Sequence, residues 1–386
     1  TTALTHTYRG YLGDSTPIVT GATGDVARTV QKRLDDYVSV KDFGAVGDDS
    51  TADVVAIQRA IDELYSDTDQ DDVRARRTLF FPAGTYKINA SLTIPPYAHL
   101  VGEGPDKTII KNSASAPALV TEDDDGNVYG GIGNAGATTP TQIQISNMTI
   151  RTTVAYGGIS IDNATKVFVN NCKFHGTFVS GGTDASTSKG VSVRSTTALP
   201  CANIIFDQCQ FTGFARLVDM SYDVTNVRFT NCDFNTAYYG AMLGETMDGS
   251  TNGLTVGPRD IQFSGSSWST IGQQAIYVKA SSTTTGTGTR NVISNANFYA
   301  KTVANNFEGT GTFSEVPVIQ FDNDECSSVL DFFERTDLRR SDGSSNLNAA
   351  PEVQGIGIST KAIKQETLIN NTSSATTINE FPALAG

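Results

Sequence analysis

The sequence predicts an all-β protein of one architecture, a right-handed parallel β-helix, and three observations support this prediction. A six-residue pattern recurs at irregular intervals through most of the chain, as it does in a solenoid whose loops vary in length. Within each copy the apolar residues alternate with a period of two, which is the period of a β-strand. The composition, with 36 Gly and 18% charged residues, suits many short strands joined by turns.

The recurring pattern reads apolar, any, Asn or similar, small or apolar, any, apolar or aromatic. Its copies occupy residues 145–150, 169–174, 206–211, 229–234, 263–268 and 293–298, with a degenerate copy at 321–326. The third positions fall at 147, 171, 208, 231, 265, 295 and 323, so the separations are 24, 37, 23, 34, 30 and 28 residues. This irregular period predicts successive coils of one solenoid.

The alternation assigns the side chains of each copy to an interior and an exterior. Apolar residues two positions ahead of the copies extend the interior set: Ile143, Val167, Ile204, Val227, Ile261 and Ile319. Coils that stack about 4.8 Å apart would align the fourth positions in one internal row. That row comprises Met148, Cys172, Cys209, Cys232, Ser266 and Ala296.

The third positions predict a column of turns. Asn tolerates the turn conformation, and its side-chain amide can bond the amide of the next coil. The column comprises Asn147, Asn171, Gln208 and Asn231. A second family of strands falls between the copies, at residues 158–161, 190–193, 241–243 and 275–278. Several strands per coil predict separate parallel sheets that wrap one core.

An amphipathic α-helix is predicted ahead of the repeats, over residues 53–64. Ser50 or Thr51 is its candidate N-cap. Its apolar stripe comprises Val54, Ile57, Ile61 and Leu64. Residues 79–88 then predict a strand, a turn and a second strand.

Three stretches in this region carry a family resemblance. They are DFGAVGDDSTADVVAIQRAI at residues 42–61, FFPAGTYKI at 80–88 and HLVGEGPDKTII at 99–110. Together they resemble the opening of the pectate-lyase-like superfamily. More narrowly, RLDDYVSVKDFGAVGD at 33–48 resembles the junction between the virion-binding leader and the β-helix of bacteriophage tailspikes. The resemblance covers residues 26–111.

The resemblance implies a domain organisation. Residues 1–36 would be a virion-docking leader that binds other phage tail proteins, with a short helix over residues 25–37. Residues 37–345 would form the β-helix, and the predicted helix at 53–64 would cap its open end, where a sheet edge and an apolar cross-section are otherwise exposed. Residues 346–386 would form a C-terminal cap or trimerisation segment. Proteins of this kind are commonly homotrimers that bind, and often cleave, bacterial surface glycans.

The charge balance excludes some functions. The formal net charge is -13, which disfavours nucleic-acid binding. This negative charge also disfavours the binding of anionic polymers unless the molecule has a local basic groove. No apolar run approaches the ~18 residues of a membrane span, so we expect no membrane insertion.

The cysteines and the N-terminal residues predict where the protein is made. The five cysteines are odd in number and match no zinc or disulfide spacing, so they are interpreted as buried free thiols. Such thiols fit folding in the reducing cytoplasm of a host bacterium. Residues 1–10 contain no signal-peptide hydrophobic stretch, so release within a virion tail is the expected route outward.

Hydrolysis of a glycosidic bond needs two carboxylates, one as acid and one as base or nucleophile. Acids and tyrosines that flank the repeats are the weak candidates. The catalytic candidates are Asp219, Asp223 and Glu245, and the substrate-binding candidates are Tyr222, Tyr238 and Arg216. The alternative is that the acids are solvated surface residues.

Other chemistry has less support. A lyase would need a cluster of cations, and Arg216, Arg228 and Lys279 form none in the sequence, so a hydrolase is favoured over a lyase. The acidic run at 122–127 does not match a calcium loop, and the glycines at 130–136 do not match a phosphate loop. No cofactor or metal is predicted.

The sequence thus favours a bacteriophage tailspike or tail-fibre-like virion protein that binds host surface polysaccharide. A polysaccharide depolymerase on the same β-helix is one alternative, and a purely structural tail component is another. The fold alone does not separate these functions.

Overall fold

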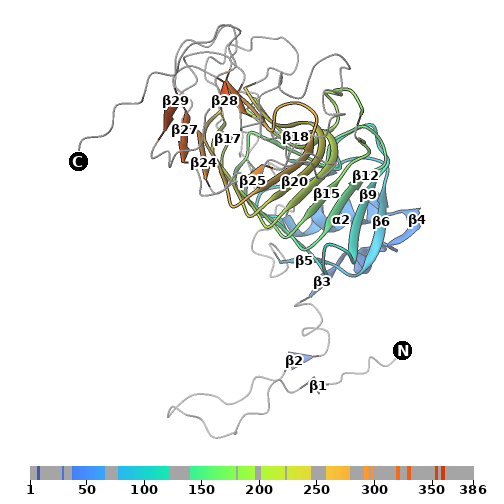
Figure 1. Cartoon of the computed structure of the whole chain (residues 1–386). Coiled ribbons are helices and arrows are strands. Elements are labelled where there is room, and N and C mark those ends of the chain that lie inside the picture. Colours follow the sequence, from blue (N-terminus) through green and yellow to red (C-terminus); the bar gives the residue numbers. More distant parts are fainter. Residues whose placement is uncertain are drawn as a thin grey trace, which may run out of the picture.

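The structure is a computed structural model, and it shows a parallel β-helix (Figure 1). It describes residues 37–65, 77–121, 140–179, 181–195, 201–221, 224–244 and 258–278, together with short strands at 7–8, 28–29, 291–294, 297–298, 319–321, 328–331, 353–354 and 358–360. The described strands of the stack pair in parallel with those of the preceding and following coils. The predicted fold class is therefore confirmed.

One side of the stack is an eleven-stranded sheet. It comprises β3 (Val38–Ser39), β5 (Leu79–Phe81), β8 (His99–Gly102), β11 (Thr141–Ser146), β14 (Thr165–Asn170), β17 (Cys201–Asp207), β19 (Val224–Thr230), β21 (Arg259–Ser264), β24 (Asn291–Ser294), β27 (Ser328–Asp331) and β29 (Ile358–Thr360). Most of the recurring six-residue copies begin in these strands and end in a strand of the other sheet.

The other sheet has sixteen strands in two ladders. The first ladder comprises β4 (Asp48–Ala52), β6 (Gly84–Ile88), β9 (Thr108–Asn112), β12 (Thr149–Thr152), β15 (Lys173–His175), β22 (Ser267–Ile271) and β25 (Asn297–Phe298). The second comprises β7 (Leu92–Thr93), β10 (Leu119–Thr121), β13 (Ile159–Asp162), β16 (Lys189–Arg194), β23 (Ile276–Val278), β26 (Ile319–Phe321) and β28 (Val353–Gln354). Two long strands, β18 (Gln210–Ser221) and β20 (Asp233–Leu243), belong to both ladders.

The interior is a set of stacked rows. The predicted row of Met148, Cys172, Cys209, Cys232 and Ser266 is at most 2% exposed, which confirms it; Ala296 lies outside the described residues. The thiols at 172, 201, 209 and 232 are free and buried, while Cys326 is not among the described residues. Burial raises the pKa of Cys172 and of Cys201 to about 12.

Aromatic rings form two further interior stacks. Phe174, Phe211, Phe234 and Trp268 stack with successive centroid distances of 5.0, 5.1 and 4.0 Å. Phe206, Phe229 and Phe263 stack at 4.9 and 5.0 Å. Each ring covers the face of the ring one coil away, so burial and ring stacking both stabilise the coil register.

The turn column is confirmed. Its members have positive φ angles of 57°, 48°, 54° and 52° at Asn147, Asn171, Gln208 and Asn231. The Asn171 side-chain amide donates to the Asn147 amide oxygen at 2.8 Å. A second positive-φ column, which the sequence analysis missed, lies five residues earlier in each coil and comprises Gln142, Lys166, Asn203, Asn226 and Asp260.

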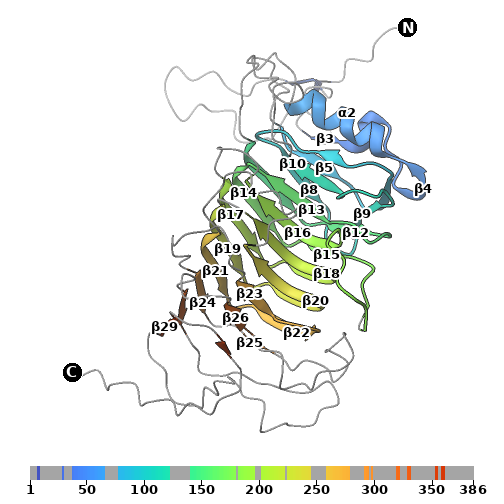
Figure 2. The ribbon, with the colours of Figure 1, turned by 90° about the horizontal axis from the view of Figure 1, so that it is seen from above.

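The N-terminal end of the stack is covered by α2 (Val54–Tyr65), as Figure 2 shows. Ile57, Ile61 and Leu64 are buried against the first coils, which confirms the predicted capping helix. The predicted N-cap is wrong, because Ser50 and Thr51 lie in β4 and donate to Asp48.

Asp53 stands at the start of the helix instead. Its carboxylate accepts the backbone N–H groups of Val46 at 2.7 Å and Gly47 at 3.1 Å, so it fixes the preceding loop. A short 3-10 helix, η1 (Val40–Phe43), precedes that loop and is capped by Ser39.

The ends of the chain differ from the predictions in two places. β1 (Thr7–Tyr8) and β2 (Arg28–Thr29) pair antiparallel, so the helix predicted over residues 25–37 is wrong at 28–29, and its other residues up to 36 lie outside the described part. β28 and β29 add coils to the two sheets beyond residue 345, the predicted end of the β-helix.

Candidate functional site

The second ladder presents a polar outer face. On β13, β16 and β18 the apolar residues at 159, 161, 191, 193, 218 and 220 are core residues, so the alternate side chains point outward. Register places Ser160, Ser192 and Asp219 in one outward column, and Asp162, Arg194 and Ser221 in the next. All of these except Arg194 are buried, so this outer face is covered.

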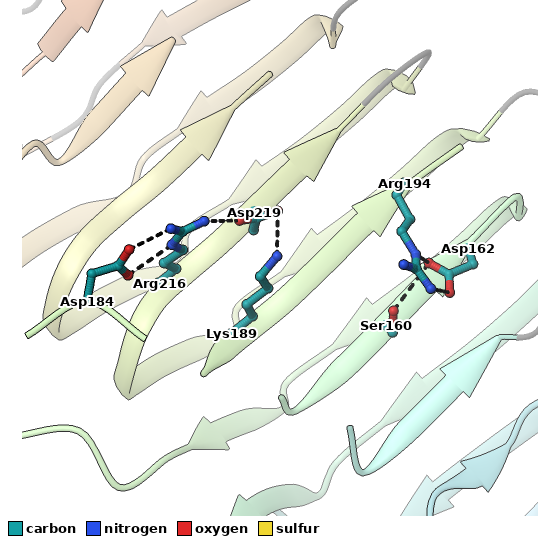
Figure 3. A network of polar contacts seen from close by, with 7 residues as sticks. All are labelled: Ser160, Asp162, Asp184, Lys189, Arg194, Arg216 and Asp219. Carbon is teal, nitrogen blue, oxygen red and sulfur yellow. Dashed lines mark hydrogen bonds and ion pairs between the residues drawn. The ribbon is translucent and has the colours of Figure 1, made fainter. Parts of the chain in front are cut away.

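Asp162 and Arg194 form a bidentate ion pair at one end of this face. Arg194 Nε donates to Asp162 Oδ1 at 2.6 Å, and Nη2 donates to Oδ2 at 2.7 Å (Figure 3). The Ser160 hydroxyl also donates to Oδ1, at 3.2 Å. The Arg194 side chain is 34% exposed, so it is the member of this group that solvent or a ligand reaches.

Asp219 is the centre of a second group, in which it contacts two cations. Lys189 Nζ lies 3.0 Å from Asp219 Oδ1, an ion pair whose geometry falls short of a hydrogen bond. Arg216 Nη1 donates to Oδ2 at 3.1 Å. Arg216 also donates two hydrogen bonds to the Asp184 carboxylate, from Nε at 3.0 Å and from Nη2 at 2.5 Å (Figure 3).

The Asp219 group consists of Asp219, Asp184, Lys189 and Arg216, so its two negative and two positive charges cancel. This formal neutrality explains why the fold tolerates these charges in a buried position. The Asp219, Lys189 and Arg216 side chains are at most 7% exposed, and charges at such depth persist only when they are paired. Asp184 belongs to the segment at 181–188 between β15 and β16, so the group fastens that segment to the sheet. Backbone contacts reinforce it, since Arg216 N donates to Ser188 O at 3.0 Å.

The structure places three of the six sequence-predicted site residues. Asp219 and Arg216 are brought together, but as a buried ion pair in which Asp219 positions two cations. Tyr238 is 1% exposed, which leaves no ring face for a sugar, because β20 runs unbroken through this position. Tyr222, Asp223 and Glu245 lie outside the described residues.

Four residues of the site were missed from the sequence: Asp162, Asp184, Lys189 and Arg194. Asp162 and Arg194 directly follow the apolar stretches at 158–161 and 190–193, which were predicted as strands, and this adjacency was an available signal. Lys189 and Arg216 are register partners 27 residues apart. This spacing does not occur between the copies of the six-residue pattern, so the pattern gave no signal that the two residues are neighbours.

Two further features bear on chemistry. Within the described ranges, no three His, Cys, Asp or Glu side chains group closely enough to hold a metal ion. The runs at 122–127 and 130–136 are outside those ranges. Nor does any described helix have the length and apolar character to cross a membrane.

Three strands per coil, a helix over one end and a polar outer face define a parallel β-helix protein of the pectate-lyase type. The chain belongs to the rhamnogalacturonase A/epimerase, pectate lyase-like family, whose model matches residues 37–256. The match begins one residue before β3, at the predicted boundary between leader and β-helix.

One curated relative and two solved structures share sequence or fold with parts of this chain. Mannuronan C5-epimerase AlgE2 of Azotobacter vinelandii is 40% identical over 83 residues, which cover 20% of this chain and 8% of that protein. The ORF18 protein of Geobacillus virus E2 has a TM-score of 0.54 at 15% identity, over 86% of this chain and 61% of that one.

The N-terminal fragment of gene product 12 of bacteriophage Phi29 has a TM-score of 0.51 at 14% identity, over 84% of this chain and 65% of that one. The chain therefore spans less than a tenth of the curated relative and less than two thirds of either viral structure. At these identities the two viral structures show a shared fold.

Proposed function

We propose that this chain is a bacteriophage virion protein of the tailspike or tail-fibre type that binds polysaccharide on the host surface. The observation that carries the proposal is the likeness of its β-helix to two viral proteins, one of them from bacteriophage Phi29, over 84–86% of the chain. The leader would dock on other tail proteins, and three copies would associate. Synthesis would take place in the host cytoplasm, in keeping with the buried free thiols.

The exposed Arg194 side chain at one end of the second ladder's outer face supports a role in glycan binding. Carboxylate, guanidinium and hydroxyl groups are the donors and acceptors that recognise sugar hydroxyls, and the Asp162–Arg194 pair holds them rigidly. Arg194 is the member that a glycan would contact. The buried Asp219 group would act behind it by holding the 181–188 segment in place.

The enzymatic alternative is a glycoside hydrolase acting on the same glycan. It is favoured by the match to a family whose description includes rhamnogalacturonase A. Asp223 and Glu245 remain its candidate acids, since both oxygens of Asp219 face buried cations. A purely structural tail role is the third reading.

One experiment separates these readings. Purified protein is incubated with surface polysaccharide of the host, and both binding and polymer length are followed. Binding at unchanged length supports the adhesin, new reducing ends support the hydrolase, and unsaturated ends support a lyase. No binding and no cleavage would leave the structural role and overturn glycan recognition. Arg194→Lys, which keeps the charge but loses the bidentate contact, is expected to weaken binding.

The leader is tested separately. Removal of residues 1–36 is expected to abolish incorporation into particles while the β-helix stays folded, because the family match and the first core strand begin after them. Particles that still carry the shortened chain would contradict leader docking. Solution mass of the full chain tests the trimer.

A further inference from the structure

Lys189 and Asp219 form the one buried ion pair between a lysine and a carboxylate among the residues that the structure describes. Their side chains are 5% and 0% exposed, and Nζ lies 3.0 Å from Oδ1 (Figure 3). The other described lysine pairs are those of Lys107, Lys111 and Lys173, and they leave the lysine 63%, 29% and 33% exposed. At Lys189 and Asp219, an amine and a carboxyl group therefore meet where solvent does not reach.

This pair lacks the hydrogen bonds that normally accompany a buried ion pair. Neither Lys189 Nζ nor Asp219 Oδ1 makes a hydrogen bond within the described part of the chain, although both atoms are buried. An ammonium group carries three N–H donors, and a buried donor without an acceptor costs free energy. Condensation of the pair to an amide would remove both charges and two of the three donors.

The two oxygens of Asp219 have different surroundings, and these suit the formation of an amide. Oδ2 accepts a hydrogen bond from Arg216 Nη1 at 3.1 Å, and Asp184 in turn holds the same guanidinium through Nε and Nη2. Oδ1 faces Lys189. A cation fixed beside Oδ2 stabilises the negative charge that develops on this oxygen when a nucleophile adds to Cγ. Oδ1 is then the oxygen that leaves.

We propose that Lys189 and Asp219 condense to an intramolecular isopeptide bond that joins β16 to β18. The Lys189 ammonium first transfers one proton to Oδ1, which gives a neutral amine and a carboxylic acid. The Nζ lone pair then adds to Cγ, and the Cγ–Oδ2 π pair moves onto Oδ2. A second proton passes from Nζ to Oδ1. The electron pair on Oδ2 restores the carbonyl, the Cγ–Oδ1 bond breaks, and one water molecule leaves.

The reaction needs no external reagent, because the ammonium and the carboxylate supply all the atoms of the water that leaves. Two groups held in contact react as one molecule, and effective molarities for such reactions reach about 10⁵–10⁸ M. Burial protects the product from hydrolysis. The site also stays neutral afterwards, because Arg216 and Asp184 remain as a matched pair.

The bond would tie two consecutive coils together. Lys189 is the register partner of Arg216, three residues before Asp219, so the link runs diagonally between neighbouring strands. Each coil of a solenoid is held mainly by contacts with its neighbours, and a covalent link would prevent these two coils from separating. The inference concerns the covalent structure of the chain and does not depend on the proposed function.

The test is the mass of the full chain, measured after denaturation. The expected mass is that of the sequence less one water molecule. After digestion with trypsin, residues 174–194 are expected to be joined to residues 217–228 without cleavage after Lys189, because trypsin does not cut at an acylated lysine. Fragmentation of the joined peptides should place the link between Lys189 and Asp219.

Lys189→Arg keeps the cation but removes the amine that condenses, so this variant is expected to have the full mass of its own sequence. Lys173→Arg is the matched control. It makes the same substitution in the exposed pair with Asp106, so one water molecule should still be missing. Far-UV circular dichroism verifies that each variant is folded.

Three outcomes would overturn the proposal. They are an unchanged protein with the full mass of its sequence, a Lys189→Arg variant that still lacks one water molecule, and a loss of water that maps to a succinimide at an Asp-Gly pair. Such pairs occur at residues 125–126, 248–249 and 342–343. Peptide mapping of the unchanged protein decides the question even if Lys189→Arg does not fold.

Discussion

The two ladders of the sixteen-stranded sheet share two strands, and in both of them inward and outward side chains alternate. They differ in whether the outward charged side chains are buried and paired. On the second ladder the outward face is covered, and its charges occur as matched pairs such as Asp219 with Lys189. On the first ladder the outward face is open. Lys87, Lys111, Arg151 and His175 share one outward register position there, and within the described residues the printed ion pairs give a carboxylate partner only to Lys111. The difference follows from access to water. A charge under the covered face is desolvated and needs a partner within the protein, whereas an exposed charge is hydrated and needs none.

The largest expected effect tests the covered face. Asp219→Ala leaves Lys189 and Arg216 buried without their shared carboxylate, and breaking a buried pair costs about 3–5 kcal/mol. Urea denaturation measures this loss. Asp49→Asn, which breaks the exposed pair with Lys111 and keeps a residue that tolerates the positive φ of 62° at this position, is the control and is expected to cost under about 1 kcal/mol. Equal losses of unfolding free energy in the two variants would contradict the difference between the covered face of the second ladder and the open face of the first.

The next effect tests the turn column that joins the eleven-stranded sheet to the first ladder. Asn171→Ala forces a Cβ-bearing residue without a local hydrogen bond into positive φ and removes the amide bond to Asn147, for about 2 kcal/mol in total. Asn171→Gly keeps the turn accessible and should cost roughly half of that. Thermal unfolding of both variants is the measurement, and a larger loss for Gly would contradict this account.

A smaller effect of opposite sign is expected on the open face. Lys87→Gln/Arg151→Gln removes like-charge repulsion between neighbouring strands, so the free energy of unfolding should rise by about 0.5 kcal/mol. The gain should vanish in about 1 M salt, where such repulsion is screened. A loss of stability at low salt would mean that these cations stabilise the fold.

The smallest effect concerns His175. Burial, and secondarily the Arg151 cation, hold the pKa of His175 below 6.5. Burial also lowers the pKa of His99. A histidine whose pKa is lower in the folded than in the unfolded state binds its proton less well when folded, so stability should fall as the pH drops below 6.5. Proton NMR titration should show that the pKa of His175 rises in the Arg151→Gln variant. An unchanged pKa would mean that the Arg151 cation has no effect on the titration of His175.

Much of the fold was predictable because its signals are local and periodic. The interior row and the Asn147–Asn171 column follow from a six-residue pattern that contains both the strand period and the turn residue. The second positive-φ column was not predictable, since Gln, Lys, Asn and Asp occupy it and share no single turn signal.

The candidate site was predictable only in part. Asp219 and Arg216 were named, but as surface groups, because sequence does not reveal that the outer face of the second ladder is covered. The contact of Arg216 and Asp219 with Lys189 depends on the register between β16 and β18, which the six-residue repeat does not specify. Tyr238 was misplaced because the sequence gives no sign that β20 continues from the first ladder into the second.

The helix α2 changes how the end of the stack that it covers can come apart. In a solenoid each coil gains its stability from the coil before and the coil after, so a terminal coil without a cover is held on one side only. Because α2 packs on the N-terminal coils, unravelling from this end requires the helix to detach first. Its detachment would expose the edges of the first strands and the apolar cross-section of the first coils, so α2 resists fraying at the end that it covers.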